Sequence, residues 1–240
     1  YTYVPFGVTD LAGAMAGMRA LGIRGLGVSM PYKQAILPLL DAVDPMAAQI
    51  GAVNTVVNEE GCLTGHNTDW IGAVRALEET TELRGARVLL LGAGGAARAV
   101  ASGLVSRGAI VSIANRDRNK ASALAHQVGA SVADTDVLRQ TDSFDVVVNA
   151  TSVGMSGASG DDACSPIPEE AIRPGLVVMD IVYKPIETEL VRAARRRGAK
   201  TVHGGRMLLH QAARQFELYT GQTAPLQAME TALLEHVGGG

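Results

Sequence analysis

The pattern of hydrophobic positions changes partway along the 240-residue chain. Up to residue 68, short strand-like segments alternate with helix-like ones and end in a predicted hairpin at 53–67. From residue 87 onward, uninterrupted apolar runs such as RVLLLG alternate with amphipathic segments. Uninterrupted runs are typical of strands buried on both faces, and their alternation with helices is typical of a parallel, doubly wound sheet. The pattern therefore predicts an α/β fold with two lobes, the second of the Rossmann type.

The first lobe is expected to contain a strand at 2–6, a helix at 10–22, a strand at 23–30, a helix at 32–43, a helical turn at 46–52 and the hairpin at 53–67. Asp10 fits the N-cap of the first helix, and Gly22 lies just past its end. Pro38 interrupts the second helix, because proline lacks a backbone N–H. The hairpin turn is expected at Asn58–Gly61.

The second lobe is expected to begin with a helix at 69–80. Its further elements are strands at 87–92, 109–116, 143–152 and 176–183 and helices at 95–108, 117–129 and 188–200. After residue 204 the pattern predicts two helices and no strand.

Composition and charge exclude several classes of protein. The net charge of −3 provides no basic surface for nucleic acid or for an anionic membrane. No apolar run reaches the length of a membrane span, and no secretory segment opens the chain. Cys62 and Cys164 are far apart and outside any metal-ligand spacing, so we expect a cytoplasmic protein without a metal. The first residues, YTYVPFGV, resemble a strand entered partway, so we expect a further segment before them.

A glycine-rich turn follows the strand at 87–92. Gly92-x-Gly94-x-x-Ala97 lies between that strand and the next helix. Glycines at these positions allow the backbone to approach a pyrophosphate, and the helix N-terminus offers free N–H groups and partial positive charge. The strand–turn–helix context favours dinucleotide binding over a turn needed only for packing. The residues expected around the phosphates are Gly92, Ala93, Gly94, Gly95, Ala96 and Ala97.

The end of the next strand indicates which dinucleotide binds. NAD sites usually have an acidic residue there, whereas this chain has Asn115 and Arg116, with Arg118 and Lys120 close behind. Guanidinium and ammonium groups suit a 2′-phosphate, so the sequence favours NADP as the cofactor. Asp117 argues for the opposite choice, because its carboxylate would repel the phosphate. A solvated helix start with mixed charges is the other interpretation.

Candidate reactive groups stand near the ends of predicted strands. Lys33 follows the strand at 23–30, and Asp69 opens the helix at 69–80. A dehydrogenase needs a proton donor and acceptor at the carbinol or carbonyl oxygen. Taken singly, Lys33 could be a solvated surface residue, Asp69 a helix cap and Asn54 a turn stabiliser.

The order of short motifs along the chain resembles the shikimate dehydrogenase family. The motifs are GVSMPYK, IGAVNTVV, GHNTDW, LLGAGGAARAV, ANR, NATSVGM, MDIVYKPIETEL and HQAARQFELYTG, and they cover nearly the whole chain. The resemblance implies that Lys33 and Asp69 are the catalytic pair. It implies that the substrate-binding residues are Ser29, Asn54, Tyr183 and Gln211. It also implies that the nicotinamide half of the cofactor is surrounded by Ala150, Thr151, Ile181, Gly204 and Met207.

The same resemblance implies that different segments of the chain bind the substrate and the cofactor. Residues 1–71 would bind substrate, 72–205 would form the NADP-binding Rossmann domain, and 206–240 would be helices packing on the first lobe. The expected function is the NADP-dependent reduction of 3-dehydroshikimate to shikimate in aromatic amino-acid biosynthesis, by a monomer or homodimer. The alternatives are an NAD-dependent quinate/shikimate dehydrogenase and a low-activity binding or regulatory protein.

Three departures from the family's usual pattern bear on the substrate. Gly27-Val28-Ser29 replaces Asn-Val-Thr, Arg206 stands where a second glycine is usual, and the carboxylate-binding Ser-x-Ser segment is not among these residues. ALGIRGLGVSMPYK and QFELYTG look more similar to the shikimate dehydrogenase-like branch of the family. The physiological substrate therefore stays open at this point.

Overall fold

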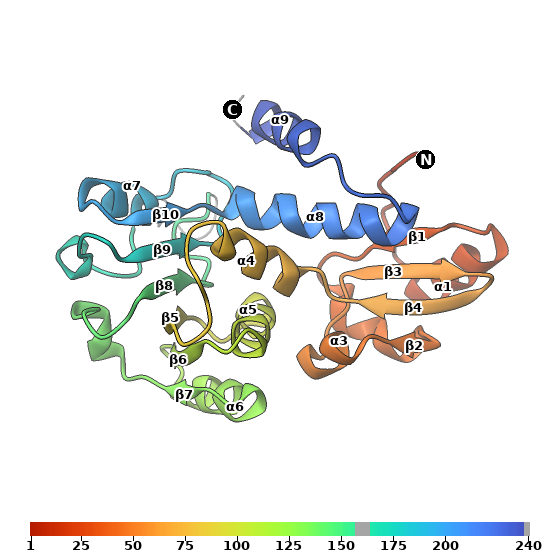
Figure 1. Cartoon of the computed structure of the whole chain (residues 1–240). Helices are drawn as coiled ribbons and strands as arrows, with labels where there is room; N and C mark the ends of the chain where they lie inside the picture. Colours follow the sequence, from red (N-terminus) through yellow and green to blue (C-terminus); the bar gives the residue numbers. More distant parts are fainter. Residues whose placement is uncertain (157–163, 238–240) are drawn as a thin grey trace. The chain divides into compact units, whose positions relative to one another are not determined.

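The computed structural model describes residues 1–156 and 164–237, which form two compact units (Figure 1). The first unit comprises Tyr1–Thr68 and Gln215–Gln222, and the second comprises Asp69–Arg214 and Thr223–Gly240. Residues 215–222, which belong to the C-terminal segment expected to pack on the first lobe, group with the first unit. The packing expected for the rest of 206–240 stays a prediction.

The first unit contains a four-stranded sheet of order β1-β3-β4-β2. Its elements are α1 (Leu11–Ala20), β1 (Gly25–Gly27), α2 (Tyr32–Ala35), η1 (Leu37–Leu39), β2 (Ala42–Val43), α3 (Pro45–Ile50), β3 (Thr55–Glu59) and β4 (Cys62–His66). Strand β3 is antiparallel to β1 and β4, and β2 is parallel to β4. The apolar core of the unit consists of Met15, Met18, Ile36, Ala47, Val53, Val56 and Leu63.

Most of the elements expected in this unit are present. The Asp10 carboxylate accepts from Gly13 N at 2.9 Å and caps α1, and Gly22 lies past the helix end with a φ of 62°. The helix expected at 32–43 is divided into α2 and η1 just before Pro38, where proline prevents the helical hydrogen bond. The strand expected at 2–6 was wrong, because this segment has no regular secondary structure and the described sheet does not include it.

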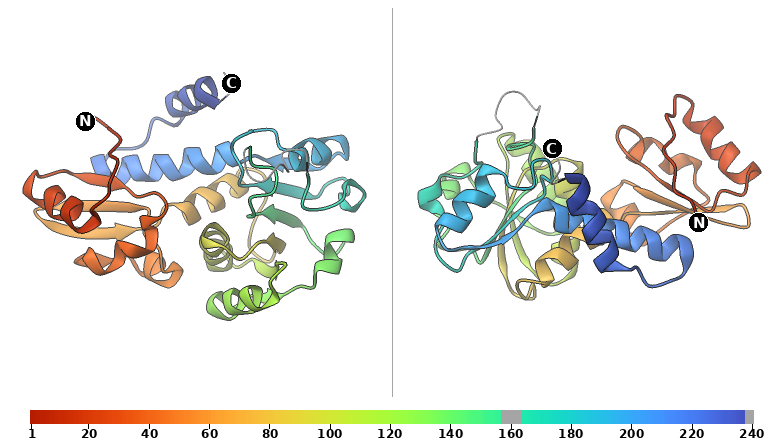
Figure 2. Two further views of the ribbon diagram at one scale, coloured as in Figure 1. Left: turned by 180° about the vertical axis from the view of Figure 1, so that it is seen from behind. Right: turned by 90° about the horizontal axis from the view of Figure 1, so that it is seen from above.

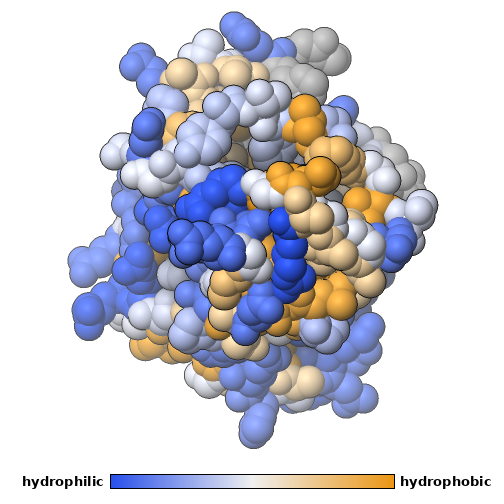
Figure 3. Space-filling view, turned by 90° about the vertical axis from the view of Figure 1, so that its right-hand side faces the viewer, coloured by the Kyte–Doolittle hydropathy of each residue, from blue (hydrophilic) through white to orange (hydrophobic). Residues whose placement is uncertain are grey.

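The surface of the first unit is mixed in character. Figure 3, which views the side drawn at the right of Figure 1, shows hydrophilic residues gathered near the centre of the face with hydrophobic ones beside them. Within the unit, Arg19 pairs with Asp41 at 2.8 Å and Arg24 pairs with Glu59 at 3.3 Å. Exposed pairs of this kind contribute at most about 1 kcal/mol, so the apolar core stabilises the unit more than its surface charges do.

The second unit is built on a six-stranded parallel sheet of order β10-β9-β8-β5-β6-β7. Its strands are β5 (Arg87–Leu91), β6 (Ile110–Ala114), β7 (Ser131–Val132), β8 (Val146–Asn149), β9 (Val177–Asp180) and β10 (Lys200–Val202). Its helices are α4 (Asp69–Glu78), α5 (Gly95–Ser106), α6 (Arg118–Val128), η2 (Thr135–Arg139), η3 (Glu169–Ala171), α7 (Glu189–Arg196), most of α8 (Gly204–Thr220), and α9 (Leu226–Val237).

Helices cover both faces of this sheet (Figure 2). Val88 and Leu90 of β5 pack into one apolar cluster with residues of α4, α5 and α6. Leu89 and Leu91, which point to the opposite face, pack into a second cluster with residues of α7. Because successive side chains of a strand alternate between faces, a sheet buried on both sides requires the uninterrupted apolar run seen in β5. The predicted doubly wound parallel sheet is confirmed. The pattern missed the short strands β2, β7 and β10.

Candidate active site

The glycine-rich turn lies between β5 and α5. Gly92 has a φ of 106°, and a Cβ at this position would lie 2.8 Å from the carbonyl oxygen of Ala150. Its backbone N–H donates to Ala114 O at 2.9 Å. Glycine is therefore required here both by the backbone angle and by the close approach of the end of β8.

The next two glycines leave the start of α5 bare. Gly94 is the N-cap of α5, no side chain accepts from the first turn, and a Cβ on Gly94 or Gly95 would meet nothing within 4 Å. The open backbone and the N-terminal end of the helix dipole fit a pyrophosphate group. Ala97 is fully buried and packs α5 on the sheet, as the third position of the motif requires.

The charges after β6 have different partners. The Asp117 carboxylate accepts from Asn119 N at 3.0 Å and from Lys120 N at 3.2 Å, and so caps α6. The carboxylate therefore has a structural role at the start of α6, and its effect on a bound phosphate stays a prediction. Arg118 forms an ion pair with Asp134.

Arg116 is exposed, and the described part of the chain provides no hydrogen bond or ion pair for its guanidinium. Lys120 Nζ lies 3.9 Å from the Asp117 carboxylate, and the Asn115 amide donates to Asp117 O at 2.9 Å. Among the expected phosphate ligands with a positive charge, Arg116 is therefore the one whose charged group other side chains engage least.

The residues expected around the nicotinamide half gather at the carboxyl ends of β8 and β9. Ala150 and Met207 belong to one buried cluster, and Ile181 packs against it. A Cβ on Gly204 would contact the carbonyl oxygens of Ile181 and Val182, so α8 begins directly against the segment after β9. Thr151 N and Oγ1 both donate to Asn149 Oδ1, at 3.1 and 2.6 Å. The structure therefore brings these residues together in the second unit.

In the first unit, the side chain of Asn54 lies in a buried polar cluster. Asn54 is 3% exposed, and its Nδ2 donates to Thr68 Oγ1 at 3.0 Å. Its Oδ1 accepts from Thr55 Oγ1 and from Thr68 N, each at 2.8 Å. Gln215 of α8 donates through Nε2 to Thr55 Oγ1 at 2.9 Å and to Asn54 O at 3.2 Å. Sequence reasoning did not find Thr55, Thr68 or Gln215.

Backbone bonds join the segments of Ser29 and Lys33 to that of Asn54. Val53 N donates to Lys33 O at 2.8 Å, and Val28 N donates to Asn54 O at 2.7 Å. Ser29 is exposed and Lys33 is partly buried. The first unit thus presents three of the expected site residues on adjoining segments.

The remaining expected residues belong to the second unit. Asp69 is the first residue of α4, and Gln211 lies on α8. A Cβ on Gly72 would lie 3.1 Å from Gln211 N, so the two helices pack closely at this level. Tyr183 follows β9 and is 45% exposed.

Arg206, which stands where the family usually has glycine, joins three helices. Its Nε donates to the Glu79 carboxylate at 2.9 Å, and it also pairs with Glu230 of α9. His210 Nε2 lies 2.8 Å from the same Glu79 carboxylate. Arg206 is therefore a structural link between the end of α4, α8 and α9, a role that the sequence did not reveal.

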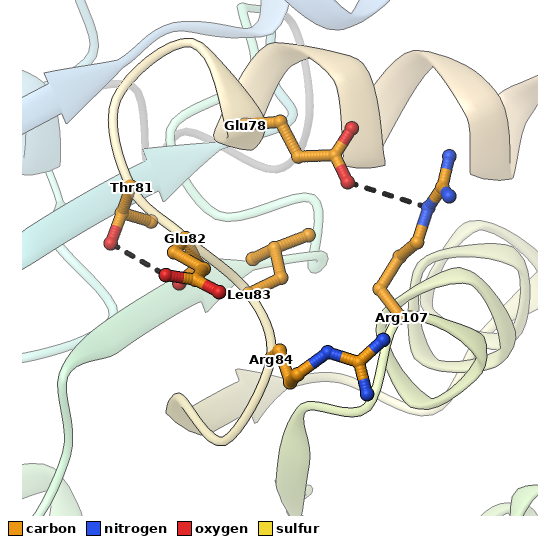
Figure 4. A pocket seen from close by; sticks show the side chains of 6 residues that line it. All are labelled: Glu78, Thr81, Glu82, Leu83, Arg84 and Arg107. Carbon is orange, nitrogen blue, oxygen red and sulfur yellow. Dashed lines mark hydrogen bonds and ion pairs between the residues drawn. The ribbon is translucent and has the colours of Figure 1, made fainter.

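A surface pocket of about 390 Å³ lies elsewhere in the second unit (Figure 4). It is lined by Glu78, Thr81, Glu82, Leu83, Arg84 and Arg107. Glu78 and Arg107 form an ion pair across it at 3.4 Å. Leu83 and Arg84 precede β5 and Arg107 follows α5, so the pocket borders the amino-terminal edge of the sheet. Ligands of such sheets bind at the carboxyl ends of the strands, and the pocket is not the expected site.

Two further observations concern metals and membranes. In residues 1–156 and 164–237, no group of His, Cys, Asp and Glu side chains could hold a metal ion. None of the helices that the structure describes is both long enough and apolar enough to cross a membrane.

Comparison with known proteins identifies the family of the chain. Residues 1–56 match the shikimate dehydrogenase substrate binding domain, 75–183 match shikimate/quinate 5-dehydrogenase, and 204–234 match the shikimate 5′-dehydrogenase C-terminal domain. The chain is 44% identical to the shikimate dehydrogenase (NADP(+)) of Moorella thermoacetica, with 98% of this chain and 83% of that protein covered.

Solved structures give the same result. A shikimate dehydrogenase in complex with NADP+ superposes with a TM-score of 0.92 at 38% identity, covering 99% of this chain and 85% of that one. The Thermus thermophilus shikimate 5-dehydrogenase in complex with NADP(H) and shikimate superposes with a TM-score of 0.86 at 38% identity, covering 96% and 85%.

Proposed function

The chain belongs to the shikimate dehydrogenase family, and from this premise we propose that it catalyses the reversible, NADP-dependent reduction of 3-dehydroshikimate to shikimate. The observation that supports this most directly is the bare start of α5 followed by the exposed Arg116 at the end of β6. The first accommodates a pyrophosphate and the second a 2′-phosphate.

The cofactor would be held along one edge of the sheet in the second unit. The backbone of Gly94 and Gly95 would bind the pyrophosphate, and Arg116 would bind the 2′-phosphate. The other residues proposed to surround the adenosine half of the cofactor are Ala93, Ala96, Asn115, Arg118 and Lys120. The residues on the nicotinamide side are Ala150, Thr151, Ile181, Gly204 and Met207. When bound, NADPH supplies the hydride that reduces the ring ketone of the substrate.

Lys33 and Asp69 are the proposed catalytic residues. Reduction of the ketone would develop negative charge on its oxygen. The Lys33 ammonium stabilises this charge and gives a proton to the oxygen. The Asp69 carboxylate accepts a hydrogen bond from a substrate hydroxyl. In the oxidative direction, Lys33 receives the proton that the carbinol loses.

The substrate is a small polyhydroxylated acid, which needs donors and acceptors for its hydroxyl groups. Ser29, Asn54, Tyr183 and Gln211 are the proposed ligands. An amide can both donate to and accept from a hydroxyl, which suits Asn54 and Gln211 to this task. We assign substrate binding to the domain at 1–71 and NADP binding to the domain at 72–205. Cys62 and Cys164 are exposed and form no disulfide among the described residues, which is compatible with the reducing cytoplasm that this proposal includes.

Steady-state oxidation assays test the proposal. Shikimate and quinate are each supplied with NADP+ and with NAD+, and formation of the reduced cofactor is followed by absorbance. The highest kcat/KM is expected for shikimate with NADP+. A higher value for quinate with NAD+ would indicate the alternative dehydrogenase. Cofactor and shikimate binding without turnover would indicate a binding protein and overturn the proposed function.

A further inference from the structure

A buried polar network lies at the carboxyl ends of β8 and β9. Asn149 and Asp180 are register partners on these strands, and neither has any exposed area. Asn149 Nδ2 donates to Asp180 Oδ1 at 3.0 Å, and the N–H of Val182 donates to the same oxygen at 3.0 Å. Thr188 Oγ1 donates to Asp180 Oδ2 at 2.7 Å. Both carboxylate oxygens therefore have partners within the unit.

The network fixes two loops. Besides accepting from Thr151, Asn149 donates through Nδ2 to Val153 O at 3.2 Å, which holds the segment after β8. Asn149 O accepts from Ile181 N at 3.1 Å, which holds the segment after β9. Thr188 Oγ1 accepts from Val191 N at 3.3 Å and caps α7, where the second loop ends.

The carboxylate is costly to keep at this position. Burial raises the pKa of Asp180 to about 6, although the Thr188 hydroxyl, the Val182 N–H and the Asn149 amide all favour the ionised form. Within the described residues, no cationic side chain pairs with it. The bonds that offset this cost come from Asn149 at the end of β8 and from Val182 and Thr188 in the segment after β9. The buried carboxylate therefore holds these two parts of the chain in place.

We propose that Asp180 is a positioning residue for the nicotinamide half of the cofactor, which it serves by holding, through Asn149 and Thr188, the loops that present Thr151 and Ile181. The inference rests on the proposed function only for the identity of the cofactor. Asp180 acts through its neighbours and has no part in proton transfer.

Asp180→Asn tests this with little change in volume. If the new Nδ2 takes the place of Oδ1, it faces two donors, the N–H groups of Asn149 and Val182. If it takes the place of Oδ2, the Thr188 hydroxyl loses its acceptor. In either orientation at least one buried donor is left without a partner, which the loops relieve by moving.

The measurement is calorimetric binding of NADP+ and of adenosine 2′,5′-bisphosphate, which lacks the nicotinamide half. In Asp180→Asn, we expect the Kd for NADP+ to rise about tenfold and that for the bisphosphate to change by less than about twofold. Asp145→Asn is the matched control, because Asp145 lies at the opposite end of β8 and pairs with Arg87 at 3.0 Å. This control should bind both ligands like the wild type.

A second pair of variants decides the question if Asp180→Asn does not fold. Thr188→Val removes the hydroxyl that donates to Asp180, whereas Thr188→Ser retains it. The valine variant should bind NADP+ more weakly, and the serine variant should restore the affinity. Unchanged NADP+ affinity in a folded variant without the bond, or an equal loss for both ligands, overturns the inference. Failure of the proposed function is a separate result, because the wild type would then bind these ligands without oxidising shikimate.

Discussion

In the second unit, Gly94 and Gly95 leave the start of α5 free of side chains, whereas in the first unit the amide of Asn54 is bonded to Thr55 and Thr68. One candidate site is built from exposed backbone and the other from buried side chains that hold one another. The site at the start of α5 requires that Gly94 and Gly95 carry no side chain. The site around Asn54 requires that several side chains from distant parts of the chain stay hydrogen-bonded to one another.

This difference determines how each site should respond to mutation. A side chain added at Gly94 or Gly95 blocks a ligand without disturbing the core, because there is space for it. A side chain removed near Asn54 leaves a buried donor or acceptor without a partner, and its effect reaches the residues beside it. Changes in the second unit should therefore alter binding of one ligand sharply, and changes around Asn54 should be smaller and more distributed.

The largest expected effect comes from Lys33→Ala. Without the ammonium, the charge that develops on the substrate oxygen has no proton donor, so kcat should fall on the order of 10²-fold or more. KM for shikimate should change much less, because the interaction is made mainly in the transition state. Lys200→Ala, at an exposed lysine of β10, is the control and should leave both constants unchanged. Near-normal kcat in Lys33→Ala would remove Lys33 from the mechanism.

A smaller effect, confined to one cofactor, is expected for Arg116→Ala. Charge-assisted bonds to a phosphate contribute roughly 1.5–3 kcal/mol, so KM for NADP+ should rise about 10- to 100-fold. KM for NAD+ should stay almost the same. Arg118→Ala should change KM for NADP+ by less than about threefold, because Arg118 pairs with Asp134. An equal loss with both cofactors in Arg116→Ala would mean that Arg116 is structural.

Substitutions at two positions of the glycine-rich turn should have different effects, one on NADP+ binding and the other on stability. Gly94→Ala places its Cβ in open space, so the melting temperature should be nearly unchanged while NADP+ affinity falls about tenfold. Gly92→Ala should instead destabilise the unit by roughly 1–2 kcal/mol or more, since the backbone is left-handed and the Ala150 carbonyl is 2.8 Å from the new Cβ. Thermal unfolding and NADP+ titration check both. A similar loss of stability in the two variants would contradict the finding that a Cβ has space at Gly94 but not at Gly92.

The fold and the cofactor turn could be predicted from sequence because their signals are local. The apolar run of β5 and the spacing of Gly92, Gly94 and Ala97 lie within a few residues of one another. The strand expected at 2–6 failed because a strand needs a partner, which the segment's own residues do not specify. The short strands β7 and β10 contain too few residues to show a period.

The polar networks could not be predicted because their members are far apart in the sequence. Gln215 reaches Thr55 across 160 positions, and Asp180 reaches Asn149 across 31. A polar residue that ends an apolar strand, as in VVVN and VVMD, was a signal that the sequence did offer. The cap formed by Asp117 is a local feature by contrast, because the residue and the first turn of α6 that it caps are neighbours in the sequence.

The smallest expected effect, and the sharpest test of the Asn54 cluster, comes from Gln215→Leu. Leucine fills similar space but removes the bonds from Nε2 to Thr55 Oγ1 and Asn54 O. One net hydrogen bond contributes about 1 kcal/mol, so KM for shikimate should rise about fivefold while kcat changes less than about twofold. Gln222→Leu, at an exposed position of the same unit, is the control and should be neutral. If Gln215→Leu lowers the melting temperature but leaves KM unchanged, the cluster stabilises the unit without orienting Asn54 for substrate.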